Sequence, residues 1–362
     1  MNALTAMNTV SRLAALATLP IEIAAPDIKR WQRATSDAIG AGGTTQVQYV
    51  HERSGALPGP DVLVTALVHG NEFSGAIALD ELLASSWQPM CGRVTFAFCN
   101  VAAFARFDAA QPDAARFVDE DFNRVWSDAR LATDERPNGG IAKPIAGPAA
   151  KPTVELARAR ELLPFVARAT HLLDLHSMHE RGAPLLVTGT LKRNIDFAQA
   201  LQTASQVIID SGHADGVRLR DCGAFADPAG ERVALLLEAG QHWQASSVAV
   251  ARNTLARFLV AAGTVSRPEA QTVFPDGWLL PDTTPPTPVQ VTDRVVAQSM
   301  NFAFTHTFTG GEVIAKAGTV IAHDNGKPVL TPYDSCVLVM PSVRQLRAGV
   351  TVVRLGQLVG AA

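Results

Sequence analysis

The stretch LVTALVHGNEFSGAIALDELL, residues 63–83, is the segment from which the fold class of this chain can be inferred. Its first half is an apolar run that ends at His69, which is typical of a buried strand. Its second half begins at Glu72 and has the apolar spacing of a helix. Gly70 lies between these two polar residues, so the sequence predicts a strand, a sharp turn and a helix in succession.

Similar strand-like and helix-like segments alternate from about residue 45 onward. The expected strands are 61–69, 92–100, 170–178, 183–189 and 232–240. The expected helices are 72–87, 153–169, 194–205 and 246–262. Because such alternation is typical of strands joined by crossover helices, we predict an α/β domain with a largely parallel, buried sheet flanked by helices.

A proline-rich segment, PDTTPPTPVQ at 281–290, separates this pattern from a different one. Beyond it lie short strand-like runs with Gly, Pro and Asp turns and no long helical pattern, which predicts a smaller C-terminal all-β domain. We therefore expect the α/β domain over 1–268 and the β domain over 269–362. The stretch 127–152, rich in Pro, Gly and Ala, is expected to be a surface loop at the rim of the site.

The composition excludes several classes of protein. The 362 residues are 47% hydrophobic and 18% charged, which provides for a large core and argues against disorder. The net charge of −3 offers no basic surface to nucleic acid or to a membrane, so the expected partner is a small molecule. The oligomeric state stays open, and a homo-oligomer is compatible with the sequence.

The cysteines and the N-terminal segment favour a cytoplasmic protein. The four cysteines include no C-x-x-C pair, so neither a disulfide framework nor a cysteine zinc site is expected. Residues 1–27 contain Arg12 as their one basic residue and only a short apolar run, so we expect a cytosolic N-terminal helix rather than a signal peptide. No window approaches the roughly 18 apolar residues that a membrane-spanning helix needs.

Side chains with acid–base or metal-binding chemistry lie at the ends of three expected strands. His69 and Glu72 follow the first strand, His176 lies near the end of the third, and Glu238 lies near the end of the last. Because open α/β sheets bind ligands at the carboxyl ends of their strands, these residues are expected to lie together. His₂Glu is an established set of zinc ligands, which predicts one Zn²⁺ per subunit on His69, Glu72 and His176. Glu238 is then the candidate general base that takes a proton from a zinc-activated water.

Other interpretations of these residues are open. A lone H-x-x-E pattern is common by chance, so the prediction depends on the joint placement of all four residues. Glu238 could instead pair with Arg232 for structural reasons. Asp174 lies two residues before His176 and therefore on the same face of the strand. It is either a partner that orients the metal ligand or a simple buried polar contact.

The stretch RFVDEDFNRVW, residues 116–126, contains the side chains that a substrate carboxylate requires. Guanidinium groups bind carboxylates through two hydrogen bonds and an amide adds a donor, so Asn123 and Arg124 are expected to anchor such a group. Arg116 is expected to stabilise the developing oxyanion. The alternative is a solvated charged loop in which the three acids at 119–121 neutralise the arginines.

The pieces HGNE, DEDFNR, LDLHS and LLLEAG, in this order, resemble the succinylglutamate desuccinylase/aspartoacylase family, which belongs with the zinc carboxypeptidases. The resemblance covers about residues 45–265. It implies a mixed eight-stranded sheet and the hydrolysis of N-acyl amino acids to a carboxylate and a free amino acid. It also implies zinc ligands in HGNE and DLH, an oxyanion arginine eight positions before Arg124, a carboxylate clamp at Asn123 and Arg124, and a glutamate base on a strand.

Some members of that family hold the acyl carboxylate with a further arginine shortly before the catalytic glutamate. The candidates here are Arg218, Arg220 and Arg232, and Arg220 is preferred as a substrate-binding residue. Some members also use a tyrosine of the β domain, for which Tyr333 is the counterpart by domain, although its neighbours in sequence do not match closely. The sequence thus predicts a zinc-dependent amidohydrolase of N-acyl amino acids. A carboxypeptidase or esterase on the same scaffold, and a non-catalytic binding module, are the alternatives.

Overall fold

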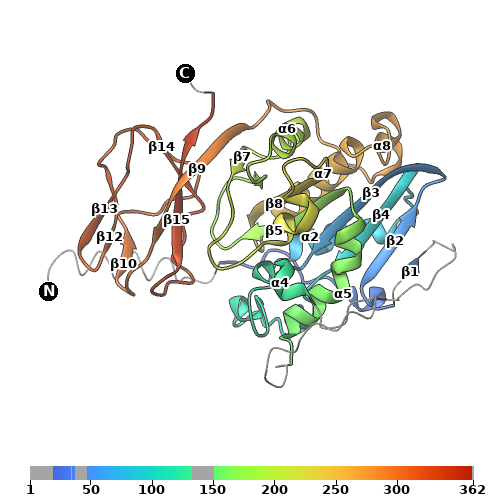
Figure 1. Cartoon of the computed structure of the whole chain (residues 1–362), viewed down its shortest axis with the longest axis horizontal. Helices are drawn as coiled ribbons and strands as arrows, with labels where there is room; N and C mark the ends of the chain where they lie inside the picture. The colour runs from blue at the N-terminus through green and yellow to red at the C-terminus, as the bar shows by residue number, and fades with distance from the viewer. Residues whose placement is uncertain (1–18, 34, 37–46, 133–150, 361–362) are drawn as a thin grey trace.

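The computed structural model describes residues 19–33, 35–36, 47–132 and 151–360, and Figure 1 shows how they are arranged. The expected N-terminal helix, and most of the expected rim loop at 127–152, lie outside these residues. Among the helices that are described, none is long and apolar enough to cross a membrane.

A twelve-stranded mixed sheet runs through the described part of the molecule, in the order β1-β2-β4-β3-β5-β8-β6-β7-β9-β15-β14-β11 (Figure 1). Strands β4, β3, β5 and β8 are parallel to one another, whereas β2 is antiparallel to β4 and β6 is antiparallel to β8. The first eight strands confirm the mixed sheet of the expected α/β fold; β1, β2 and β7 are additions that the sequence pattern did not predict. These strands are β1 (Thr35–Ser36), β2 (Val50–Ser54), β3 (Leu57–Ala66), β4 (Cys91–Phe98), β5 (His171–Met178), β6 (Leu185–Val187), β7 (Gln206–Ile209) and β8 (Val233–Gln241).

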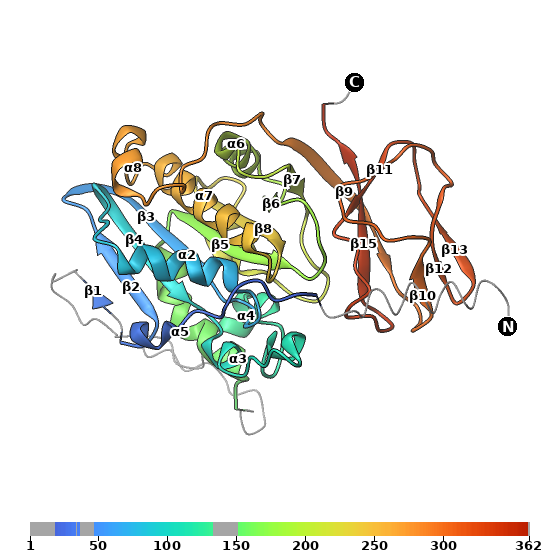
Figure 2. The same ribbon diagram turned by 180° about the vertical axis from the view of Figure 1, so that it is seen from behind.

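Helices cover both faces of this sheet. Helices α2, α6, α7 and α8 pack on one face around a large apolar cluster, and Figure 2 shows α2 and α7 lying side by side across it. Helix α5 packs on the opposite face with several short helical turns. The longer helices are α2 (Phe73–Ala84), α5 (Val154–Arg168), α6 (Lys192–Leu201), α7 (Ala245–Ala261) and α8 (Arg267–Val273). The short ones are η1 (Ile28–Trp31), α3 (Val101–Phe104), η2 (Pro112–Ala115), η3 (Phe122–Arg124), α4 (Asp128–Leu131), η4 (Leu219–Asp221) and η5 (Gly223–Phe225).

Two glycines explain how the turn after β3 brings distant segments together. A Cβ on Gly70 would lie 2.4–2.5 Å from backbone atoms of three residues between 103 and 115, so a larger residue has no space there. The amide of Gly70 donates to the carbonyl of Arg116 (3.1 Å), which ties the turn to the segment at 116–126. A Cβ on Gly75 would lie 2.5 Å from that of Leu175, so α2 packs directly on β5.

The C-terminal strands form the expected all-β region and extend the central sheet. Strand β9 pairs in parallel with β7, and a separate three-stranded sheet follows the order β10-β12-β13. Phe274 and Trp278 still pack in the core of the α/β domain, so the boundary at residue 268 stays a prediction. The C-terminal strands are β9 (Thr287–Val296), β10 (Phe302–Phe304), β11 (Val313–Ile314), β12 (Val320–Asp324), β13 (Lys327–Leu330), β14 (Cys336–Val339) and β15 (Thr351–Leu358).

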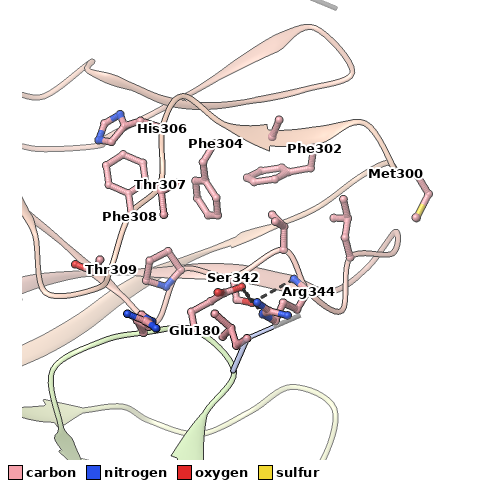
Figure 3. Close-up of a pocket in the computed structure, with 16 residues that line it drawn as sticks. Glu180, Met300, Phe302, Phe304, His306, Thr307, Phe308, Thr309, Ser342 and Arg344 are labelled. Carbon is pink, nitrogen blue, oxygen red and sulfur yellow. Dashed lines mark hydrogen bonds and ion pairs between the residues drawn. The ribbon is translucent and has the colours of Figure 1, made fainter. Parts of the chain in front are cut away.

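A second contact between the two regions involves the loop after β5. Glu180 on this loop accepts a hydrogen bond from Ser342 Oγ (3.3 Å) and pairs with Arg344 Nε (3.2 Å). This contact forms one side of a cavity of about 460 Å³, and Figure 3 shows the rings of Phe302 and Phe304 on the other side. The loop that follows the predicted ligand His176 is therefore held against the β region.

Candidate active site

The turn after β3 and the end of β5 bring His69, Glu72 and His176 together. Glu72 lies between the two imidazoles, with Oε1 2.7 Å from His69 Nδ1 and Oε2 2.9 Å from His176 Nδ1. One potential ligand atom of each residue lies within 4.8 Å of the others, and all three side chains are buried. The joint placement that the sequence predicted is therefore present, and the three residues could hold a metal ion.

The outer nitrogen of each imidazole is held by an aspartate. His176 Nε2 donates to Asp174 Oδ2 (2.8 Å), and His69 Nε2 donates to Asp121 Oδ1 (3.0 Å). A histidine that donates from Nε2 presents the lone pair of Nδ1 to the space beside Glu72, which is the form that binds a metal. Of the two interpretations of Asp174, the orienting partner is thus supported by its geometry.

The buried charges of this cluster attract positive charge, which the two imidazoles or a bound cation can supply. Burial alone would raise the pKa of Glu72, but His69 and His176 hold that pKa well below its usual range. Burial alone would lower the pKa of His176, but Asp174 and Glu72 raise it well above its usual value. The two histidines thus keep Glu72 ionised, and two nitrogens with one carboxylate form a donor set that zinc accepts.

Glu238 lies beside this cluster, and no ion pair or hydrogen bond joins its side chain to another described residue. It is in register with His176 across the parallel pair β5 and β8, so both side chains lie on the same face of the sheet. Its Oε2 is buried and has no hydrogen-bond partner among the described residues, and Arg232 instead donates to the carbonyl of Ala167. Burial raises the pKa of Glu238 to about 8. The alternative of an Arg232–Glu238 ion pair therefore has no support in this structure.

Arg116 reaches the same place from the segment fixed by Gly70. Its Nη1 donates to Glu72 Oε1 and to His179 Nε2, both at 3.3 Å. The other ring nitrogen of His179, Nδ1, lies 3.2 Å from Nε2 of His242. His179 and His242 thus form a chain behind Arg116, and no local motif in the sequence indicates that chain.

Asn123 and Arg124 lie next to the loop before β8 rather than in a solvated loop. Asn123 is buried, and its Oδ1 accepts a hydrogen bond from the amide of Leu219 (2.8 Å). Arg124 donates to the carbonyl of Asn123 (2.7 Å) and forms no ion pair with any carboxylate in the described ranges. Burial lowers the pKa of Arg124, a sign that its charge is poorly solvated.

The three acids between the arginines have other partners. Asp121 contacts His69 and Arg116, and Glu120 pairs with Arg130. Asp119 accepts from the amide of Val154 at the start of α5. Neutralisation of Arg124 by its neighbours in sequence is thus not what the structure shows.

Arg220, the preferred candidate for the acyl carboxylate, is engaged with the protein itself. Its guanidinium donates to the carbonyls of Thr188 (2.6 Å) and Ala234 (3.1 Å) and to Asp221 Oδ1 (2.5 Å). Only 2% of the residue is exposed, and burial lowers its pKa to about 10. A role for Arg220 in substrate binding stays a prediction.

Tyr333 is likewise engaged elsewhere. Its hydroxyl lies 2.5 Å from Thr292 Oγ1 on β9, and no contact joins it to the cluster around Glu72 within the described residues. The structure therefore adds no support for Tyr333 as a substrate-binding residue.

The catalytic-domain model of the succinylglutamate desuccinylase/aspartoacylase family matches residues 58–259, which include every residue of the cluster described above. No curated protein matches the chain significantly.

Solved structures share the fold across both regions of the chain. Succinylglutamate desuccinylase from Vibrio parahaemolyticus is similar with a TM-score of 0.57 and 18% identity, over 87% of each chain. A succinylglutamate desuccinylase/aspartoacylase from Rhodobacter sphaeroides gives 0.58 and 19%, over 87% of this chain and 90% of that one. The product-bound ectoine utilization protein EutE (DoeB) from Ruegeria pomeroyi gives 0.56 and 19%, over 86% and 89%.

Proposed function

The chain belongs to the succinylglutamate desuccinylase/aspartoacylase family, and we propose on that basis that it is a zinc-dependent hydrolase of the amide bond in N-acyl amino acids. The observation that carries the proposal is the convergence of His69, Glu72 and His176 beside an unpartnered Glu238. These four groups come from three strand ends, and a purely structural role does not require a buried carboxylate oxygen that has no hydrogen-bond partner among the described residues.

The substrate would be held by its carboxylate. The guanidinium of Arg124 has no carboxylate partner, and the amide nitrogen of Asn123 donates no hydrogen bond, within the described residues. Such a pair would fix one end of an N-acyl amino acid and leave its amide carbonyl facing Arg116. Arg116 is already held by Glu72 and His179, so it can donate to a developing oxyanion without reorganising.

Proton transfer would fall to Glu238. A zinc ion on His69, Glu72 and His176 would supply an acidified water and polarise the amide carbonyl. The carboxylate of Glu238 would take the proton of the attacking water and deliver it to the leaving amine. A pKa raised to about 8 by burial makes this carboxylate a stronger base than an exposed glutamate, as that exchange requires.

The proposal is tested by a hydrolysis screen with zinc-loaded protein. We expect release of free amine from small N-acyl amino acids and little release from dipeptides of the same size, measured by an amine-reactive dye. Arg116→Lys is the matched variant, because it keeps the charge and removes the fork, and it should lower kcat by about tenfold or more. A dipeptide hydrolysed faster than every N-acyl amino acid would assign the chain to peptidases instead.

A further inference from the structure

An arginine of the C-terminal region faces the candidate active site. On β15, Val353 and Leu355 point into a cluster of the β region, so Arg354 between them points to the opposite face of the strand. Its neighbour across the pair with β14 is Val339, which packs with Leu185 and Leu236 of the α/β domain. Leu185 is itself in register with Glu238, so β15 presents Arg354 to the side of the sheet that carries the catalytic groups.

Arg354 also lies on the wall of a cleft between the two regions. The cleft measures about 500 Å³, and its two sides are the loop after β7 and the strands β9 and β15. Asp210 and His213 line it from the loop, and Arg294, the partner of Arg354 across the strand pair, lines it from β9. Several of its lining residues are exposed, so solvent reaches it.

The loop that forms one side of this cleft adjoins Arg124. Val217 bridges to Val125, and a Cβ on Gly216 would lie 2.3 Å from the carbonyl oxygen of Arg124. The predicted carboxylate clamp and Arg354 therefore lie near the same short loop. Burial lowers the pKa of Arg354, and Glu238 is among the carboxylates that oppose this shift, as expected of neighbouring groups.

Positive charge is in excess among these side chains. Arg354 and Arg218 share the carboxylate of Asp210, and Arg218 and Arg220 share that of Asp221, so three guanidinium groups face two carboxylates. Arg354 forms its ion pair with Asp210 through Nε alone, at 3.2 Å. Its two terminal nitrogens donate no hydrogen bond to any described residue. Its fork is thus available to an anion, and Arg124 adds a second guanidinium that has no carboxylate partner in the described ranges.

We propose that Arg354, supplied by the C-terminal region, is a specificity-determining residue that holds a second carboxylate of the substrate. The inference rests on the proposed function, in which Asn123 and Arg124 hold the first carboxylate. The second carboxylate belongs either to the end of the acyl chain or to the side chain of the amino acid. Both sources offer the same planar anion to the fork of Arg354.

The alternative is a purely structural role, in which the ion pair between Arg354 and Asp210 joins the two regions and Arg354 does not contact the substrate. The two roles differ in a measurable way, because only the specificity role makes ligand affinity depend on the second carboxylate. The test is therefore a ratio of affinities for matched ligands, which a general loss of stability does not change.

The experiment is calorimetric titration of zinc-loaded protein in a Glu238→Gln background, which leaves the ligands uncleaved. One pair of probes is N-succinylglycine and N-butyrylglycine, which differ in a carboxylate on the acyl chain. The other pair is N-acetylglutamate and N-acetylglutamine, which differ in the charge of the amino-acid side chain. We expect the diacid of one pair to bind about 10–100-fold more tightly than its uncharged partner, and we expect Arg354→Gln to remove that preference.

Two further variants separate the outcomes. Arg354→Lys keeps the charge next to Asp210 and loses the fork, so it should fold and lose most of the preference. Arg252→Gln is the control, because it removes an ion pair with Glu81 on the opposite face of the sheet. This variant should keep the full preference for the diacid. A preference that survives both Arg354 variants, or wild-type affinity that is equal within both probe pairs, overturns the inference. Loss of N-acyl amino acid hydrolysis with this preference intact would count against the proposed function alone.

Discussion

Replacing Asp174 by asparagine tests whether the protein fixes the tautomer of the predicted ligand His176. Asp174 is fully buried, accepts from Thr65 Oγ1 through Oδ1 (2.7 Å), and accepts from His176 Nε2 through Oδ2 (2.8 Å). Asparagine has the same shape, so no cavity is created. Its amide, however, cannot accept at both positions, because one of the two oxygens becomes an NH₂ donor.

The consequence falls on the metal site. With the amide oxygen kept toward Thr65, the amide nitrogen meets the N–H of His176, and the imidazole must move its proton to Nδ1 to avoid two opposed donors. Nδ1 is the atom that faces Glu72, so the metal would lose a lone pair. Loss of such an outer partner typically costs 10–100-fold in metal affinity, or about 1.4–2.7 kcal/mol.

The measurement is zinc affinity by competition with a chromogenic chelator at constant pH. Thr65→Val is the matched control, because it removes the hydrogen bond to Oδ1 and leaves the contact with His176 in place. We expect a small effect from the control and the full loss from Asp174→Asn. Equal zinc affinity of Asp174→Asn and wild-type protein would refute the argument about the tautomer.

Four other predictions concern the base, the turn, acid stability and the metal. Glu238→Gln should keep its zinc by elemental analysis and lose about 10²–10⁴-fold in kcat, and full activity would remove Glu238 from the mechanism. Gly70→Ala should cost about 1–3 kcal/mol in urea unfolding because its Cβ meets backbone atoms at 2.4 Å, whereas Gly230→Ala, with no neighbour closer than 3.5 Å, should cost little. Burial lowers the pKa of His213 to about 4, so the folded state binds fewer protons than the unfolded state, and stability should fall as pH drops from about 6.5 toward 4. His213→Gln should flatten that part of the profile, and an unchanged slope would contradict the assignment. Chelation should lower the melting temperature, because an ion that binds only the folded state adds about 2.7 kcal/mol at 100 times its Kd.

Local patterns in the sequence were sufficient for most of the architecture. The apolar runs and helical periodicities predicted β3, β4, β5, β8 and the helices between them. A strand that is buried on both faces of a sheet has a nearly continuous run of apolar residues, which can be recognised in the sequence. β2 was missed because VHERS carries charges whose partners are remote: Arg53 donates to carbonyls at the end of α2. The four residues of the cluster could be predicted from the sequence because each follows or ends an apolar run, and ligands bind at the carboxyl ends of strands in such sheets. The residues are His69, Glu72, His176 and Glu238.

The sequence alone determined which strands end in metal-type side chains and which loop carries the arginines. Tertiary structure alone decided what each charge contacts: Asp121 holds His69, Arg220 is engaged with Thr188 and Ala234, and Arg354 pairs with Asp210, 144 positions earlier in the chain. The reason is physical. Periodicity records whether a side chain faces the core or the solvent, whereas the partner of a buried charge depends on distances across the sheet, and no local pattern contains those distances.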